Sequence, residues 1–148
     1  MAEIRIRPVQ KDDFEQWNAL WQDYLEFYES SVIDEVTQTT FARLCDPECH
    51  DQNAFVAERE GKLLGLVHYI YHAHNWHVEQ VTYLQDLFAL PEARGLGLGR
   101  ALIEAVYQAA DDNGTPTVYW MTQDFNADAR KLYDRIGSLT PFIKYART

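Results

Sequence analysis

The feature that most constrains the fold is a run with glycine at every second position, Arg94-Gly95-Leu96-Gly97-Leu98-Gly99-Arg100. The apolar run before it, Tyr83 to Leu90, is typical of a strand, and the amphipathic run after it, Leu98 to Ala110, is typical of a helix. A glycine turn from strand to helix gathers backbone N–H groups at the positive end of the helix dipole. Gly97 and Gly99 carry no side chain that would keep a pyrophosphate from the backbone. The run therefore predicts a binding site for a phosphorylated cofactor.

The length and net charge of the chain limit the number of domains and the kinds of partner that we expect. A chain of 148 residues is long enough for one domain, residues 1–148, with a core of its own. Its net charge of −10 argues against a nucleic-acid partner, because nucleic-acid phosphates would be repelled. No signal peptide is recognisable after Met1, and no apolar run approaches the roughly 18 residues of a membrane span. We expect no membrane partner and a cytoplasmic location.

Cysteine and histidine spacing does not indicate a metal site. Cys45 and Cys49 suit free thiols in a reducing compartment, and together with His50 they are too few ligands for a typical zinc site. The remaining histidines cluster around the predicted strand 62–71 and the loop after it, and we expect them to be exposed loop residues: His68, His72, His74 and His77. No metal cofactor is expected.

Periodicity along the chain predicts an α/β (α+β) fold. The predicted strands cover residues 4–7, 54–59, 62–71, 78–90, 117–122 and 141–146. The predicted helices cover residues 14–28, 37–44, 98–110 and 126–136. Residues 117–122 are apolar on both faces, which is typical of a central strand, and Glu60-Gly61 predicts a hairpin turn.

Two common glycine-turn folds do not fit. A dinucleotide fold carries its glycines near the start of the chain's first βαβ unit, and here they follow four strands. A P-loop ends in Gly-Lys-Ser or Gly-Lys-Thr, whereas this turn ends in Gly99-Arg100-Ala101.

The turn and its surroundings resemble the GNAT superfamily of acetyl-CoA-dependent N-acetyltransferases. The family signature is Gln or Arg, two residues, Gly, one residue, then Gly or Ala, and Arg94 to Gly99 matches it. Leu87-Phe88-Ala89-Leu90-Pro91-Glu92 upstream and Asn126-x-x-Ala129-x-x-Leu132-Tyr133 downstream also match. The resemblance implies a GNAT-like acyl-CoA N-acyltransferase fold: a mixed central sheet with splayed middle strands, flanked by about four helices.

Three segments are similar to particular branches of this family. Residues 114–120 and 141–147 resemble the fungal histone and polyamine acetyltransferases, and Tyr83-Leu-Gln-Asp-Leu-Phe88 resembles the diamine acetyltransferases. The fungal resemblance implies a homodimer formed through the last predicted strand, where Phe142, Ile143 and Tyr145 would make an apolar edge.

The resemblance also implies roles for particular residues. Acetyl-CoA would be the co-substrate, with its pyrophosphate on the glycine turn and its pantetheine paired to a strand edge. The implied cofactor-binding residues are Leu87, Phe88, Ala89, Arg94, Gly95, Leu96, Gly97, Leu98, Gly99, Arg100 and Asn126. Tyr133 would be the general acid, since a phenol with a pKa near 10 can protonate a departing thiolate.

The sequence offers several candidates for the general base and a few residues for the acceptor site. The diamine branch has a glutamate where this chain has Gln85, and an amide cannot take a proton. Asp86 is adjacent, but neighbours on a strand point to opposite faces. A water chain, Glu79 or His77 could also serve as the base. We expect Tyr24, Tyr28 and Asp86 to contact the acceptor, because carboxylates and aromatic rings suit an ammonium group.

These features predict an enzyme that moves an acetyl group from acetyl-CoA to a primary amine by direct attack in a ternary complex. The acceptor would be a small amine, a polyamine or an amino acid. One alternative is a protein or histone lysine acetyltransferase. Another is a non-catalytic acyl-CoA-binding module, because Gln85 cannot act as the base.

Overall fold

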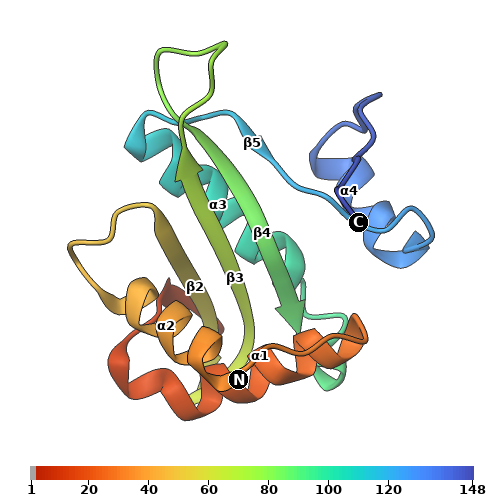
Figure 1. The fold of residues 1–148 in the computed structure, drawn as a ribbon. Coiled ribbons are helices and arrows are strands. Elements are labelled where there is room, and N and C mark those ends of the chain that lie inside the picture. The colour runs from red at the N-terminus through yellow and green to blue at the C-terminus, as the bar shows by residue number, and fades with distance from the viewer. Residues whose placement is uncertain (1–2) are drawn as a thin grey trace.

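The computed structural model describes residues 3–148 and shows one mixed sheet with helices on both faces (Figure 1). The strands are β1 (Arg5–Pro8), β2 (Gln52–Arg59), β3 (Lys62–His72), β4 (Val81–Ala89) and β5 (Val118–Tyr119). The helices are α1 (Phe14–Phe27), α2 (Asp34–Cys45), α3 (Leu98–Asn113) and α4 (Ala127–Ile136), with short 3-10 turns η1 (Lys11–Asp13) and η2 (Pro91–Ala93). The predicted fold class is confirmed.

The sheet order follows the chain, β1-β2-β3-β4-β5. The first four strands are antiparallel neighbours, and β5 pairs parallel to β4. Helix α3 makes the long connection that a parallel pair needs. The parallel pairing spans only Thr82↔Val118 and Tyr83↔Tyr119, after which the two strands separate. The splayed middle strands expected from the family resemblance are therefore present.

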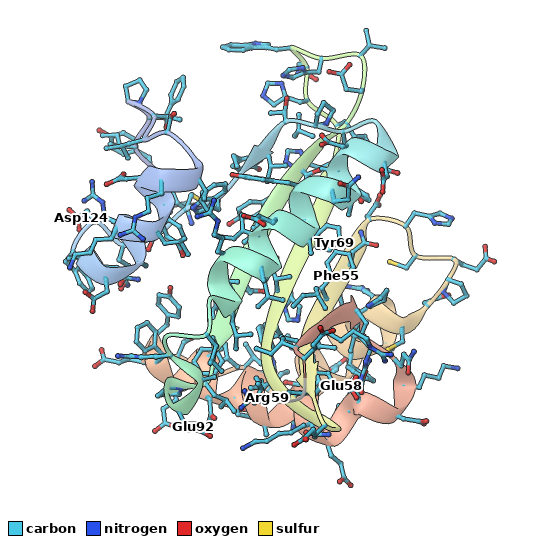
Figure 2. The ribbon with its side chains drawn as sticks, turned by 180° about the vertical axis from the view of Figure 1, so that it is seen from behind. Phe55, Glu58, Arg59, Tyr69, Glu92 and Asp124 are labelled. Carbon is cyan, nitrogen blue, oxygen red and sulfur yellow. The ribbon has the colours of Figure 1, made fainter. Side chains whose placement is uncertain are left out.

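Each face of the sheet has its own apolar core. Helices α1 and α2 bury Trp17, Trp21 and Phe41 against one face, and α3 buries Leu102 and Val106 against the other. In the rear view, α3 lies in front of the sheet and crosses its strands (Figure 2). Since full burial of one large apolar side chain stabilises by about 1.5–3 kcal/mol, these two layers hold the sheet that carries the site.

The β2–β3 hairpin turns at the predicted dipeptide. Glu60 and Gly61 both have positive φ, 51° and 79°. Positive φ at both central residues is the mark of a type I′ turn, which matches the twist of paired strands. Further along the hairpin, Phe55 and Tyr69 stack across the two strands with ring centroids 5.4 Å apart (Figure 2).

Two predicted strands were wrong in place or extent. Residues 117–122 were expected to form a central strand, and the structure has only β5 at the edge of the sheet. Residues 141–146 were expected to form a strand and do not. A strand requires a partner for its backbone groups, and the pairing available along β4 ends at Tyr119. The side chains of Phe142, Ile143 and Tyr145 are accordingly 77–89% exposed.

No helix within residues 3–148 combines the length and apolar character that crossing a bilayer requires. Within the same residues, no group of three or more His, Cys, Asp or Glu side chains is arranged to hold a metal ion.

Candidate active site

The glycine turn lies between η2 and the first turn of α3. Gly95 and Gly97 have φ of 83° and 74°, in the left-handed region that favours glycine. A Cβ built on either residue would meet no atom within 4 Å, so the space beside the turn is open. The first hydrogen bond of the helix runs from the Ala101 N–H to the Gly97 carbonyl (3.0 Å). The amides of Leu98, Gly99 and Arg100 come before that bond and are left for an outside acceptor.

The structure separates the roles of the three glycines. A Cβ on Gly99 would lie 3.2 Å from Leu132 Cδ2, so this glycine lets α4 approach α3 closely. The side chain of Leu98 is buried in the core beneath the turn, and only its amide can serve a ligand. Arg100 Nε lies 2.7 Å from Glu104 Oε1, one helical turn away. The turn thus offers backbone amides to an anion, with the Arg100 guanidinium already paired.

The separation of β4 and β5 frees one edge of β4. Beyond Tyr83, the remainder of β4 pairs only with β3 among the described strands. Its residues Leu87, Phe88 and Ala89 therefore present backbone groups on the β5 side, where an extended ligand could add as a strand. The side chains of Leu87 and Ala89 pack toward α3, and Phe88 packs toward α1. Only the backbone of this segment faces the opening.

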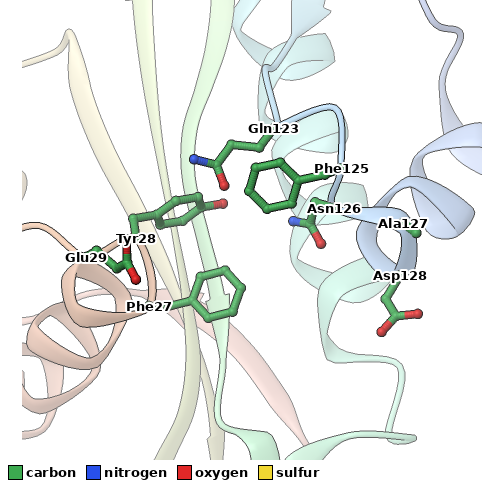
Figure 3. Close-up of a pocket in the computed structure, with 8 residues that line it drawn as sticks. All are labelled: Phe27, Tyr28, Glu29, Gln123, Phe125, Asn126, Ala127 and Asp128. Atoms are coloured by element: carbon green, nitrogen blue, oxygen red, sulfur yellow. The ribbon is translucent and has the colours of Figure 1, made fainter.

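A cavity of about 500 Å³ lies between the end of α1 and the segment that leads into α4 (Figure 3). The ring of Tyr28 extends from α1 toward Gln123 and Phe125 on the opposite side, in front of β4. Asn126 also lines this cavity. It occupies the N-cap position of α4, but its side chain caps no helix amide, and its Nδ2 lies 3.3 Å from Thr122 Oγ1. Its amide oxygen is thus not used to cap the helix.

Tyr133 lies on α4, two turns beyond Asn126. Its ring packs edge-on against Trp120, with centroids 5.5 Å apart. Burial, with a smaller contribution from Tyr28, raises the pKa of Tyr133 to about 12. The hydroxyl therefore stays protonated throughout the neutral and mildly alkaline range, as a proton or hydrogen-bond donor must.

The expectation that Gln85 and Asp86 point to opposite faces was wrong. The β3–β4 register shifts at this point: His68 pairs with Asp86, and Tyr69 pairs with Leu84. Gln85 is therefore an extra residue in a β-bulge, which breaks the alternation of a regular strand. Both Gln85 and Asp86 line one cavity of about 310 Å³, between α2 and the α1–α2 face of the sheet.

His68 is not the exposed loop residue that was expected. It lies within β3, and it is only 4% exposed. Its Nδ1 is 2.9 Å from Asp86 Oδ2, and its Nε2 accepts a hydrogen bond from the Trp17 indole N–H at 3.0 Å. The sequence does contain an indication of this role, because His68 is a lone imidazole within an otherwise apolar strand. A polar group buried in such a strand needs hydrogen-bond partners.

His77 and Glu79, which were candidates for the general base, lie in the loop between β3 and β4. His77 Nδ1 and Glu79 Oε1 are 3.1 Å apart and pair with each other in partly exposed positions. At the end of β3, His72 Nε2 lies 2.7 Å from the Tyr119 hydroxyl. This loop enters β4 at Val81, whereas the glycine turn follows the other end of that strand (Figure 1).

Tyr24 and Tyr28 are on the side of α1 that faces β4. The Tyr24 ring lies 6.3 Å from that of Phe88 and 5.1 Å from that of Tyr28. Burial, and after it the charge of Asp86, raise the pKa of Tyr24 above its ordinary value. Burial and the same carboxylate also raise the pKa of Tyr28. The structure thus brings together the three residues expected at the acceptor site.

Comparison with known proteins places this arrangement in a family. Residues 16–137 match the model of the Acetyltransferase (GNAT) family. The D-amino-acid N-acetyltransferase HPA3 of Saccharomyces cerevisiae is 41% identical over 145 residues, which cover 97% of this chain and 90% of that protein. The thialysine N-epsilon-acetyltransferase of Mus musculus is 32% identical, covering 93% of this chain and 85% of that protein.

A solved structure shares the same fold. The structure of AAC(6')-Iy in complex with a bisubstrate analog superposes with a TM-score of 0.86 at 19% identity, covering 99% of each chain. Since the family model matches most of the sequence and a relative is 41% identical along nearly the whole chain, this protein belongs to the GNAT family of N-acetyltransferases.

Proposed function

We propose that this enzyme transfers the acetyl group of acetyl-CoA to a primary amine on a small molecule, foremost an amino acid. The observation that carries the proposal is the pairing of the open glycine turn with the free edge of β4. The glycine turn offers backbone amides to a diphosphate, and the edge of β4 offers backbone groups that can pair with the amides of pantetheine. Together they suit the diphosphate of coenzyme A and the pantetheine arm that extends from it.

The glycine turn suits a diphosphate even though the chain carries a net charge of −10. The amides of Leu98, Gly99 and Arg100 stand at the positive end of the α3 dipole. Arg94 is exposed at the start of the turn and supplies a cation. Residues 94–100 would thus hold the pyrophosphate, with Leu87, Phe88 and Ala89 pairing with the pantetheine arm and Asn126 orienting it from the 500 Å³ cavity.

The acceptor assignment draws on the relatives. The yeast relative is named for D-amino acids and the mouse relative for thialysine. Both are small molecules with a primary amine. In this chain, Tyr24 and Tyr28 supply aromatic faces and Asp86 a carboxylate beside the β4 edge, which suits an ammonium group. Tyr133 would donate to the sulfur as it leaves.

A thiol-release assay tests the proposal. The full-length protein is incubated with acetyl-CoA and a panel of D-leucine, D-lysine, spermidine and a lysine-containing peptide, and free thiol is measured over time. Calorimetry with CoA is run in parallel. We expect CoA binding and faster release with a small-molecule amine than with the peptide. Absence of CoA binding would refute the proposal.

The two competing functions give different results in the same assay. A protein lysine acetyltransferase would favour the peptide. An acyl-CoA-binding module would bind CoA and release no thiol with any amine. Gln85, which cannot accept a proton, is the residue that makes this second outcome worth measuring.

We also propose that the chain forms a homodimer through residues 141–146 and acts in the cytoplasm. Leu139, Phe142, Ile143 and Tyr145 expose 77–89% of their surface without a partner strand in the described chain, and such an edge favours pairing with a second copy. Free Cys45 and Cys49 suit a reducing compartment. Sedimentation tests the dimer: the full chain should sediment as a dimer and a chain truncated after Thr140 as a monomer. A monomeric full chain would contradict it.

A further inference from the structure

A hydrogen-bonded chain of three side chains, from Trp17, His68 and Asp86, joins α1, β3 and β4. The Trp17 indole N–H donates to His68 Nε2 (3.0 Å), and His68 Nδ1 lies 2.9 Å from Asp86 Oδ2. Trp17 is fully buried, and the side chain of Asp86 is 12% exposed. The three residues are far apart in sequence, so only the tertiary structure assembles them.

The partners of His68 determine where its proton lies. An indole N–H can only donate, so Nε2 must accept and carries a lone pair. The ring proton is therefore on Nδ1, where it donates to the Asp86 carboxylate. A proton on Nε2 would set two N–H groups against each other in a buried site, at the cost of a lost hydrogen bond. Trp17 thus holds His68 as a neutral donor, and His68 holds Asp86 as an acceptor.

The β-bulge gives Asp86 access to a ligand. Because Gln85 is the extra residue of the bulge, Asp86 stays opposite His68 and still lines the 310 Å³ cavity. His68 contacts one oxygen of the carboxylate, Oδ2, and the Tyr24 side chain also approaches the carboxylate. Resting on the proposed function, we propose that Asp86, positioned by His68 and Trp17, accepts the proton of the acceptor's ammonium group in place of residue 85.

The proposed step balances as follows. Asp86 takes one proton from the ammonium group, which frees the nitrogen lone pair. The C–N bond forms at the thioester carbon, and the C–S bond breaks with its electron pair on sulfur. Sulfur gains a proton from water with a hydrogen bond from Tyr133, the nitrogen releases its second proton to water, and Asp86 returns its proton to solvent. The products are the acetamide, the thiol and one proton.

The groups that face Asp86 are few. His68 contacts the carboxylate from β3. The charge of Asp86 also contributes to the raised pKa values of three nearby tyrosines, which are Tyr24, Tyr28 and, on the same strand, Tyr83. The part of α2 that lines the cavity contributes only Val36, Thr40 and Leu44. The carboxylate is thus the single anionic group at this point of the cavity lining.

The pH dependence of kcat/KM distinguishes this proposal from a mechanism without a base. If Asp86 removes the proton, the enzyme uses the ammonium form, and kcat/KM stays level as the pH falls below the amine's own pKa. Without a base, only free amine reacts, and kcat/KM falls about tenfold per pH unit below that pKa. The assay uses D-leucine, or the fastest acceptor of the panel above.

We expect kcat/KM of Asp86→Asn to fall with decreasing pH below the pKa of the amine, where that of the wild type stays constant. At neutral pH, kcat/KM of the variant should be lower than that of the wild type by about a hundredfold or more. The two enzymes should converge near the pKa of the amine. Asp23→Asn, an exposed carboxylate-to-amide change on α1, is the matched control and should behave as wild type. Calorimetry with CoA confirms that each variant is folded and keeps its co-substrate site.

Two His68 variants separate positioning from packing. His68→Asn places an amide N–H where Nδ1 lies and keeps the donor to Asp86, whereas His68→Gln reaches the Nε2 position and keeps the acceptor for Trp17. If His68 positions Asp86, His68→Asn retains more of the level region than His68→Gln. If it only supports Trp17 in the core, the order reverses and the positioning role is overturned.

The outcomes also separate this proposal from the proposed function. A wild-type protein that acetylates no amine overturns the function itself. A wild-type protein that acetylates amines, with an Asp86→Asn variant of unchanged pH profile, overturns only the role of Asp86.

Discussion

Replacing Tyr133 with Phe removes a single hydroxyl and keeps the ring that packs on Trp120. Because the pKa of Tyr133 is raised to about 12, complete proton transfer to a thiolate of pKa ~8.5 would be uphill by ~3.5 units, or ~5 kcal/mol. The hydroxyl must therefore act chiefly as a hydrogen-bond donor while the C–S bond breaks. Hydrogen bonds to charged groups contribute ~1.5–3 kcal/mol, a factor of ~10 to ~150 in rate. We expect kcat to fall about a hundredfold.

The assay is thiol release at saturating acetyl-CoA and acceptor, with wild type and Tyr133→Phe side by side. Calorimetry with CoA should give the same dissociation constant for both, because the proposed contact strengthens only as the thiolate forms. Thermal unfolding should differ little, since the ring and its packing are kept.

A kcat within threefold of wild type would remove Tyr133 from the mechanism. A large loss of CoA affinity with little change in kcat would show that the hydroxyl binds the co-substrate and does not assist the leaving group. Either result would refute the reasoning from the raised pKa.

Three further predictions concern the turn, the N-terminal ion pairs and alkaline stability. Gly97→Val forces a β-branched residue to φ of 74°, at roughly 1–2 kcal/mol, and should abolish CoA binding in calorimetry while the fold survives. Gly61→Val, at φ of 79° in a distant turn, is the control and should bind CoA normally. Arg7 bonds both carboxylate oxygens of the buried Asp13 (2.8 and 2.9 Å) and lowers its pKa, so Arg7→Ala should cost about 3 kcal/mol in urea unfolding near neutral pH. This difference should shrink as acid protonates Asp13, and a pH-independent difference would contradict the pairing. The raised pKa of Tyr133 stabilises the fold fully below pH ~10, and that contribution is lost as the pH rises toward about 12, so Tyr133→Phe should reduce the alkaline loss of stability.

The sequence alone determined the features that depend on neighbouring residues. The glycine turn, the strand before it and the helix after it lie within one continuous segment, and glycine is the residue that tolerates the positive φ found at Gly95 and Gly97. The Glu60-Gly61 hairpin is equally local. These segments, with the motif of α4, were sufficient to identify the family.

The tertiary structure decided what depends on pairing between distant segments. Residues 117–122 have the apolar pattern of a central strand, but the separation of β4 from β5 leaves them at an edge. Residues 141–146 have a strand's composition and no partner strand within the described residues.

The same distinction applies to the candidate site. Tyr133 and the glycine turn could be proposed from motifs, whereas the Trp17–His68–Asp86 chain could not, because its members are 51 and 18 residues apart. A one-residue bulge in β4 also reversed the expected relation of Gln85 and Asp86. Strand register is set by the fit of whole strands to their neighbours and to the core, and this is the information that a local pattern does not carry.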